Sequence, residues 1–171
     1  MEVICVSGTP GTGKTAIARK LAKKYNLYYL DVNKIIREYR LSESYDRKRR
    51  TKIVDVNKLN KSLIREIVFF KNKNYIEMRP MSSARSTKTF KKSYIKKNNK
   101  PKKLKGMIID SHLSHYLPGK YVNLVIVTKC DIKELSKRLK KRKYPKNKIQ
   151  ENLQAEIRIY PADMLFYYRN R

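Results

Sequence analysis

The segment GTPGTGKT at residues 8–15 restricts the fold of this chain more than any other, because it fits the phosphate-binding pattern G-x-x-x-x-G-K-[ST] at every fixed position. A short apolar run rich in β-branched residues precedes it at residues 3–6. Apolar residues at helical spacing follow it: Ile17, Ala18, Leu21 and Ala22. A strand, a glycine loop and a helix in this order are the context in which the pattern binds phosphate. A plain glycine turn before a helix is the alternative.

Each fixed position of this P-loop has a physical role. Gly8, Gly11 and Gly13 let successive backbone N–H groups approach a phosphate with no Cβ in the way. The amino end of the following helix adds a partial positive charge. Lys14 supplies a mobile full charge for the outer phosphates, and the Thr15 hydroxyl is a hard oxygen ligand for Mg²⁺.

The rest of the chain alternates strand and helix patterns. Strands are predicted at residues 27–32, 106–110 and 122–127, and helices at 14–25, at 35–39, after Asp55, after Asp131 and around 149–157. The helix after Asp55 has an apolar stripe formed by Val56, Leu59, Leu63, Ile67 and Phe70, and the last helix has one formed by Ile149, Leu153 and Ile157. The aromatic tail at residues 164–168 could be a strand or the end of a helix. This order predicts a single α/β domain over residues 1–171, a P-loop fold with a doubly wound parallel sheet. Ligands of such sheets bind at the carboxyl ends of the strands, where the P-loop, Asp31 and Asp110 all lie.

The charge of the chain is strongly one-sided. Lys and Arg number 43 against 14 Asp and Glu, for a net charge of +29. Such a surface attracts polyanions, and nucleic acid is favoured over a membrane because no basic helix with a wide apolar face stands out. Residues 71–105 form a Lys/Arg-rich insertion with one acid, Glu77. Its aromatic residues could stack on RNA, or the insertion could be a solvated loop, and composition leaves both alternatives open.

Cysteine usage and hydropathy indicate the compartment. Cys5 and Cys130 each adjoin an apolar run and are interpreted as small core residues, with no metal-ligand spacing and no disulfide framework. No run of about 18 apolar residues is present. We therefore expect a cytoplasmic protein with no membrane partner.

Two side chains after the third strand are candidates for chemistry. Asp110 ends an apolar strand, where a P-loop enzyme holds the acid that binds Mg²⁺ or its water shell; a helix cap or a surface acid is the alternative. His112 follows two residues later. A neutral imidazole there could orient a water or contact a phosphate, and a purely structural histidine is an equal alternative.

Three arginines are candidate phosphate clamps: Arg37, Arg138 and Arg142. The alternative is that cations simply favour the carboxyl end of a helix. No general base for a hydroxyl acceptor is evident. A phosphate acceptor is already an anionic nucleophile and needs none, which favours transfer between phosphates over a kinase that acts on a hydroxyl.

The order of several segments resembles the adenylate kinase isoenzyme 6 family, small adenylate kinases with ATPase activity and a role in small ribosomal subunit maturation. The matching segments are the P-loop, Asp31-Val32 to Arg37-Glu38, Ser44-Tyr45-Asp46, Asp110-Ser111-His112 with Tyr116-Leu117-Pro118, Arg138-Leu139 to Arg142-Lys143-Tyr144, and Glu151 to Ile157. They cover residues 1–70 and 106–157.

The resemblance implies roles for these positions. Gly11, Gly13, Lys14, Thr15 and Ala16 would hold the phosphates of ATP. Arg37, within a monophosphate-binding segment at residues 31–54 that begins at Asp31, would hold AMP. Asp110 and His112 would form the second nucleotide motif, and Arg142 would be the arginine of a lid at residues 140–150. The implied reaction is ATP + AMP to 2 ADP, with Mg²⁺ and ATP hydrolysis, and the implied partner is a small-subunit platform ribosomal protein.

The sequence departs from this family at three places. The family has a compact turn where this chain carries residues 71–105. Lys143 replaces the glycine of the lid. The family continues into a fifth strand and a helix, whereas this sequence ends at Arg171, so we expect a shortened C-terminus.

Two hypotheses follow from the sequence. The first is a nucleoside monophosphate kinase with ATPase activity that acts around ribosomal RNA. The second is a ribosome-assembly factor that binds RNA, uses ATP as a switch and has little kinase activity.

Overall fold

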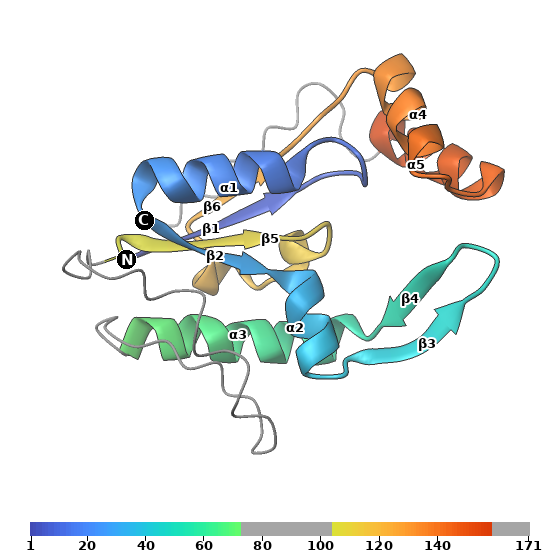
Figure 1. The fold of residues 1–171 in the computed structure, drawn as a ribbon. Helices are drawn as coiled ribbons and strands as arrows, with labels where there is room; N and C mark the ends of the chain where they lie inside the picture. The colour runs from blue at the N-terminus through green and yellow to red at the C-terminus, as the bar shows by residue number, and fades with distance from the viewer. Residues whose placement is uncertain (73–103, 159–171) are drawn as a thin grey trace, which may run out of the picture.

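A four-stranded parallel sheet forms the centre of the computed structural model, which describes residues 1–72 and 104–158 (Figure 1). Its strands are β1 (Glu2–Ser7), β2 (Leu27–Asp31), β5 (Gly106–Asp110) and β6 (Leu124–Val127). They lie in the order β2-β5-β1-β6, and every neighbouring pair is parallel. The predicted α/β fold is confirmed. Residues 73–103 of the predicted insertion, and the aromatic tail after 158, lie outside the described residues.

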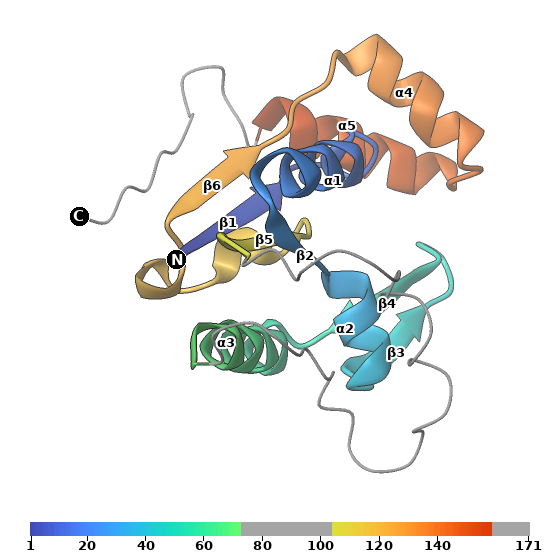
Figure 2. The same ribbon diagram turned by 60° about the vertical axis from the view of Figure 1, so that its left-hand side comes forward.

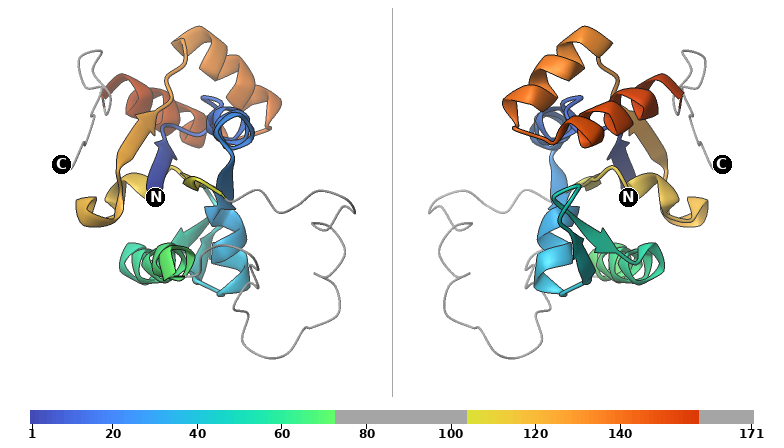
Figure 3. Two further views of the ribbon diagram at one scale, coloured as in Figure 1. Left: turned by 90° about the vertical axis from the view of Figure 1, so that its left-hand side faces the viewer. Right: turned by 90° about the vertical axis from the view of Figure 1, so that its right-hand side faces the viewer.

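Helices cover both faces of this sheet (Figure 2). The α1 helix (Lys14–Tyr25) packs on one face against Ile4, Val6 and Ile108. On the other face, α2 (Val32–Glu38) and α3 (Val56–Asn72) pack against the larger cluster that includes Val3, Cys5, Met107 and Ile109. Successive residues of β1 and β5 thus face opposite layers, as the pleat of a strand requires. Both layers are visible in Figure 3, with α1 and α3 on opposite sides of the sheet.

The α3 helix shows how the sequence specifies its packing. Its buried residues are Leu59, Leu63, Ile67 and Phe70. Their spacing of three and four residues forms one apolar stripe on the helix. Asp55 Oδ1 accepts hydrogen bonds from the backbone N–H groups of Asn57 and Lys58, at 2.7 and 3.2 Å, and so caps the first turn.

A hairpin extends from the sheet where the sequence indicated only a polar basic stretch. Its strands are β3 (Ser42–Asp46) and β4 (Thr51–Val54), which pair antiparallel. Neither strand has a buried residue, so no apolar alternation marks them in the sequence. At the tip, Asp46 Oδ1 accepts the Arg49 N–H at 2.9 Å and closes the turn.

Two helices complete the described part of the chain. The β5–β6 connection holds two short 3₁₀ turns, η1 (Ser114–Tyr116) and η2 (Gly119–Tyr121), and β6 leads to α4 (Ile132–Lys141) and α5 (Lys146–Arg158). The predicted apolar stripe of α5 is wrong at Ile157, which is 61% exposed, whereas its neighbour Glu156 is 4% exposed. None of the described helices is long and apolar enough to cross a membrane.

The turn between α4 and α5 places Lys143 in a conformation that favours glycine, with φ of +56°. The Lys143 N–H bonds to the Lys140 carbonyl at 2.8 Å, and the Tyr144 N–H bonds to the Leu139 carbonyl at 3.4 Å. These two bonds form a Schellman motif, in which the left-handed position is usually glycine.

We expect Lys143→Gly to raise the free energy of unfolding by about 1 kcal/mol relative to Lys143→Ala, because only glycine adopts this backbone conformation without steric strain. Both variants remove the same charge, so the difference isolates the backbone effect. Urea unfolding monitored by circular dichroism measures it. Equal stability of the two variants would contradict the assignment.

Candidate functional site

The P-loop, residues 8–15, connects β1 to α1 at the carboxyl edge of the sheet (Figure 1). Gly8, Gly11 and Gly13 all have positive φ, at +130°, +101° and +98°. A Cβ on Gly8 would lie 2.4 Å from the carbonyl oxygen of Thr128, and one on Gly11 would lie 2.8 Å from Leu135 Cδ1. Conformation and packing therefore both require Gly8 and Gly11, and conformation alone requires Gly13, where an added Cβ would meet no atom within 4 Å.

Thr128, which follows β6, braces this loop from behind. Its N–H donates to the Ser7 carbonyl at 2.9 Å, and its Oγ1 lies 2.6 Å from Thr12 Oγ1. Thr12 Oγ1 in turn donates to the Thr9 carbonyl at 2.8 Å. Sequence reasoning missed Thr128, because a threonine after an apolar strand is too common to be a signal.

The Lys14 ammonium group is hydrogen bonded to the P-loop. Lys14 Nζ donates to the Thr9 carbonyl oxygen at 2.8 Å. Partial burial lowers its pKa to about 8; the charges of Asp110 and Glu156 oppose this shift, and the charge of Arg142 adds to it. The structure thus brings three predicted site residues, Lys14, Asp110 and Arg142, within electrostatic range of one another.

Asp110 ends β5 as a buried carboxylate, 5% exposed. Its Oδ2 accepts a hydrogen bond from the Tyr29 hydroxyl at 2.8 Å. Burial, and then this bond, raise the pKa of Tyr29 to about 12, so the phenol remains a donor at neutral pH. Sequence reasoning missed Tyr29. It lies two residues before Asp31 on β2, the strand that pairs with β5, and so it can reach Asp110.

The Asp110 carboxylate and the Thr15 hydroxyl of the P-loop are suitable ligands for a hydrated Mg²⁺ that would also be bound by substrate phosphates. Thr15 is exposed in the first turn of α1, next to Ala16. Residues 1–72 and 104–158 contain no cluster of three or more His, Cys, Asp or Glu that could hold a metal alone. Mg²⁺ keeps several waters and binds through one or two protein groups plus substrate phosphates, so Thr15 and Asp110 fit that donor set.

The two histidines follow β5. His112 as a whole residue is exposed, yet desolvation of its imidazole lowers its pKa to about 4, with the Lys14 charge as the second cause. His115 Nδ1 lies 3.0 Å from Ser7 Oγ, which ties it to the end of β1. A neutral His112 next to Lys14 fits a group that contacts phosphate or water rather than one that adds charge.

Of the other predicted site residues, Arg138 contacts the P-loop, whereas Arg142, Arg37 and Asp31 lie at the ends of helices. Arg138 Nη1 donates to the Gly11 carbonyl at 3.4 Å, and its Nε donates to Glu134 at 2.9 Å. Arg142 caps the carboxyl end of α4, and Arg37 lies exposed in the last turn of α2; within residues 1–72 and 104–158 neither has an ion pair. Asp31 caps α2 by accepting the Asn33 N–H at 2.9 Å. Substrate roles for Arg37 and Asp31 stay predictions.

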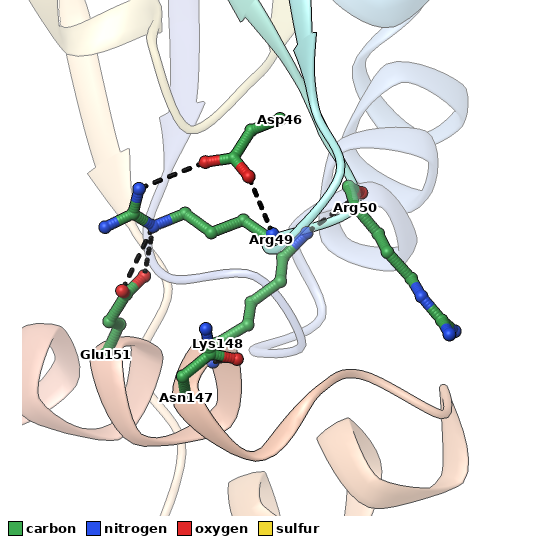
Figure 4. Close-up of polar contacts among 6 residues, drawn as sticks. All are labelled: Asp46, Arg49, Arg50, Asn147, Lys148 and Glu151. Carbon is green, nitrogen blue, oxygen red and sulfur yellow. Dashed lines mark hydrogen bonds and ion pairs between the residues drawn. The ribbon is translucent and has the colours of Figure 1, made fainter.

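The tip of the β3–β4 hairpin contacts α5 (Figure 4). Arg49 Nε donates to both carboxylate oxygens of Glu151, each at 3.1 Å, while Arg49 Nη1 pairs with Asp46 at 3.0 Å. Lys148 Nζ donates to the Arg50 carbonyl at 3.4 Å. The predicted monophosphate-binding segment and the predicted lid are therefore in contact through exposed polar groups.

Comparisons with known proteins identify relatives of this chain. A family model described as an AAA domain matches residues 4–158. The "Adenylate kinase isoenzyme 6 homolog" of Schizosaccharomyces pombe is 31% identical over 90% of this chain and 68% of its own length. The "Putative adenylate kinase" proteins of Methanosarcina mazei and Methanosarcina acetivorans are 34% and 32% identical over 90% of the chain and 67% and 66% of their lengths. The chain spans about two thirds of the length of these curated relatives.

We expect the His112 ring to titrate with a midpoint below the ordinary histidine value of about 6.5, in the direction of 4, because desolvation and the Lys14 charge disfavour the imidazolium. NMR titration of the two imidazole rings measures this midpoint, and a His115→Gln variant assigns the signals. A His112 midpoint at or above 6.5 would contradict its placement beside Lys14.

Proposed function

Because the chain belongs to the adenylate kinase isoenzyme 6 family, we propose that it is a nucleoside monophosphate kinase that converts ATP and AMP to two ADP and also hydrolyses ATP. The observation that carries the proposal is the P-loop, at which Lys14 Nζ donates to the Thr9 carbonyl oxygen and the charges of Asp110 and Arg142 act on that lysine. Two cations and a buried carboxylate at a glycine loop match the charges of a polyphosphate and its metal ion.

The proposed transfer requires little of the protein besides position and charge. A phosphate oxygen of AMP attacks the γ-phosphorus of ATP, the bond from that phosphorus to the β–γ bridging oxygen breaks, and ADP leaves. The nucleophile is already an anion, so no side chain has to remove a proton. Bound Mg²⁺ would neutralise charge on the β- and γ-phosphates. Lys14 and Arg142 would offset charge on the transferred group, and Thr15 and Asp110 would hold the metal ion or its waters.

The acceptor side of the proposed site is the segment at residues 31–54. Arg37 is its candidate ligand for the monophosphate, because a guanidinium fork fits two phosphate oxygens. In the described residues its side chain is exposed and has no ion pair, which leaves the cation free for a ligand. The hairpin at the end of this segment faces α5, so acceptor and donor sides would meet between them (Figure 4).

A second function rests on a different observation, the net charge of +29. We propose as the alternative that the chain is an ATP-switched assembly factor that binds ribosomal RNA and a platform protein of the small ribosomal subunit. Cations gather on the helix that borders the P-loop and on the hairpin tip: Lys137, Arg138, Lys140, Lys141 and Arg142 on one element, and Arg47, Lys48, Arg49 and Arg50 on the other.

We expect Lys14→Ala to lower the AMP-dependent formation of ADP from ATP by about two to three orders of magnitude in kcat, the loss typical when one preorganised charge donor is removed. Lys20→Ala is the matched control, since it removes an exposed lysine from the same helix, α1. A coupled ADP assay measures both. Equal rates for the two variants would contradict the kinase proposal, and wild-type ADP formation that ignores AMP would favour the ATPase switch.

For the assembly-factor alternative, we expect the affinity for ribosomal RNA to fall by about three to five decades between 50 and 200 mM salt, if six to ten phosphates are contacted. Fluorescence anisotropy with a labelled RNA at several salt concentrations measures the slope. Absent binding, or binding that does not respond to salt, would rule out this function.

A further inference from the structure

Glu156 is a buried carboxylate on α5, next to Ile157, which is exposed. It is the one buried residue of α5 in the described structure, at 4% exposure, although apolar residues occur on the same helix. A buried carboxylate is costly unless it is paired and hydrogen bonded. Its position therefore points to an interaction that an apolar side chain could not make.

One oxygen of this carboxylate holds the segment that braces the P-loop. Glu156 Oε1 accepts the backbone N–H of Cys130 at 2.9 Å. Two residues earlier, Thr128 contacts Ser7 and Thr12. One residue later, Asp131 caps α4 by accepting the N–H groups of Lys133 and Glu134, at 2.9 and 3.1 Å. The hydrogen bond from Cys130 to Glu156 thus joins α5 to residues 128–131, the segment that contacts the P-loop and leads into α4.

The other oxygen has no hydrogen-bond partner within residues 1–72 and 104–158, although it is buried. An unpaired buried acceptor is unfavourable, and more so when it is charged. Lys14 is a cation on which the Glu156 charge acts, after burial and the charges of Asp110 and Arg142. An ammonium group has three donors, and one of those of Lys14 goes to the Thr9 carbonyl, which leaves donors for a phosphate and for a carboxylate.

We propose that Glu156 is a positioning residue for Lys14, which braces the P-loop through Cys130 and places a fixed negative charge near the lysine that binds phosphate. In this arrangement Glu156 and Asp110 balance the charge of Lys14 from two elements, α5 and β5. The inference rests on the part of the proposed function that has ATP phosphates bound at the P-loop. It adds a residue that does not touch the substrate.

A thermodynamic cycle tests whether Glu156 acts through Lys14. The four proteins are the wild type, Glu156→Gln, Lys14→Gln and the double variant. Glutamine at 156 keeps the size and an acceptor for the Cys130 N–H but removes the charge, and glutamine at 14 keeps a donor so that binding remains measurable. Calorimetric titration with a non-hydrolysable ATP analogue and Mg²⁺ gives each affinity. Glu2→Gln is the control, because Glu2 is an exposed acid at the opposite end of β1.

We expect Glu156→Gln to weaken binding about tenfold in the wild-type background, which corresponds to one pKa unit of differential interaction, and to have no further effect beside Lys14→Gln. Glu2→Gln should leave the affinity unchanged. Equal losses in both backgrounds would show a merely structural role and overturn the proposal, as would no loss at all.

A second variant covers the case in which Glu156→Gln does not fold. Glu156→Asp keeps the charge on a shorter side chain, and we expect a smaller loss of affinity that again disappears beside Lys14→Gln. A loss that persists there would overturn the proposal. If the wild type itself does not bind the analogue, the proposed nucleotide site is overturned together with the inference about Glu156. If the wild type binds and the effects of the two substitutions are additive, only the proposed role of Glu156 is overturned.

Discussion

The close approach of Gly8 to Thr128 is the contact on which the candidate site depends. A Cβ at position 8 would lie 2.4 Å from the Thr128 carbonyl oxygen, so the loop after β1 can rest against the loop after β6 only with glycine there. Thr128 also bonds to Ser7 and lies beside Thr12, which fixes the curve of the P-loop. Because α4 begins four residues after Thr128, this contact also determines where the helix that leads to the predicted lid begins.

Near this contact, acidic residues partly offset the large positive charge of the chain. The net charge is +29, yet two of its acids are buried beside the P-loop, Asp110 and Glu156. Both act on Lys14, whereas the charge of Arg142 opposes its protonation. Farther out, exposed Glu151 joins the basic hairpin tip to α5 through Arg49 (Figure 4). Solvent screens exposed pairs, so this link would be weak and would weaken further with salt.

Much of the fold could be predicted because its signals are local. Residues close together in the sequence indicate which positions are buried in three elements: the strand–loop–helix around residues 8–15, the apolar stripe of α3 and the apolar run of β5. The hairpin β3–β4 was missed because neither of its faces is buried. The stripe of α5 was wrong at Ile157 because helical spacing shows which residues share a face and not which face the fold covers.

By itself the sequence determined the phosphate-binding loop, the α/β class and a set of candidate side chains, since glycine conformation, helical spacing and strand burial are properties of neighbouring residues. Only the tertiary structure decided which candidates meet. It brought Lys14, Asp110 and Arg142 together and added Tyr29, Thr128 and Glu156 to them. It also gave Asp31 a capping role. Parallel strands that are distant in sequence end at one edge of the sheet, so contacts at that edge depend on strand order, which no local pattern specifies.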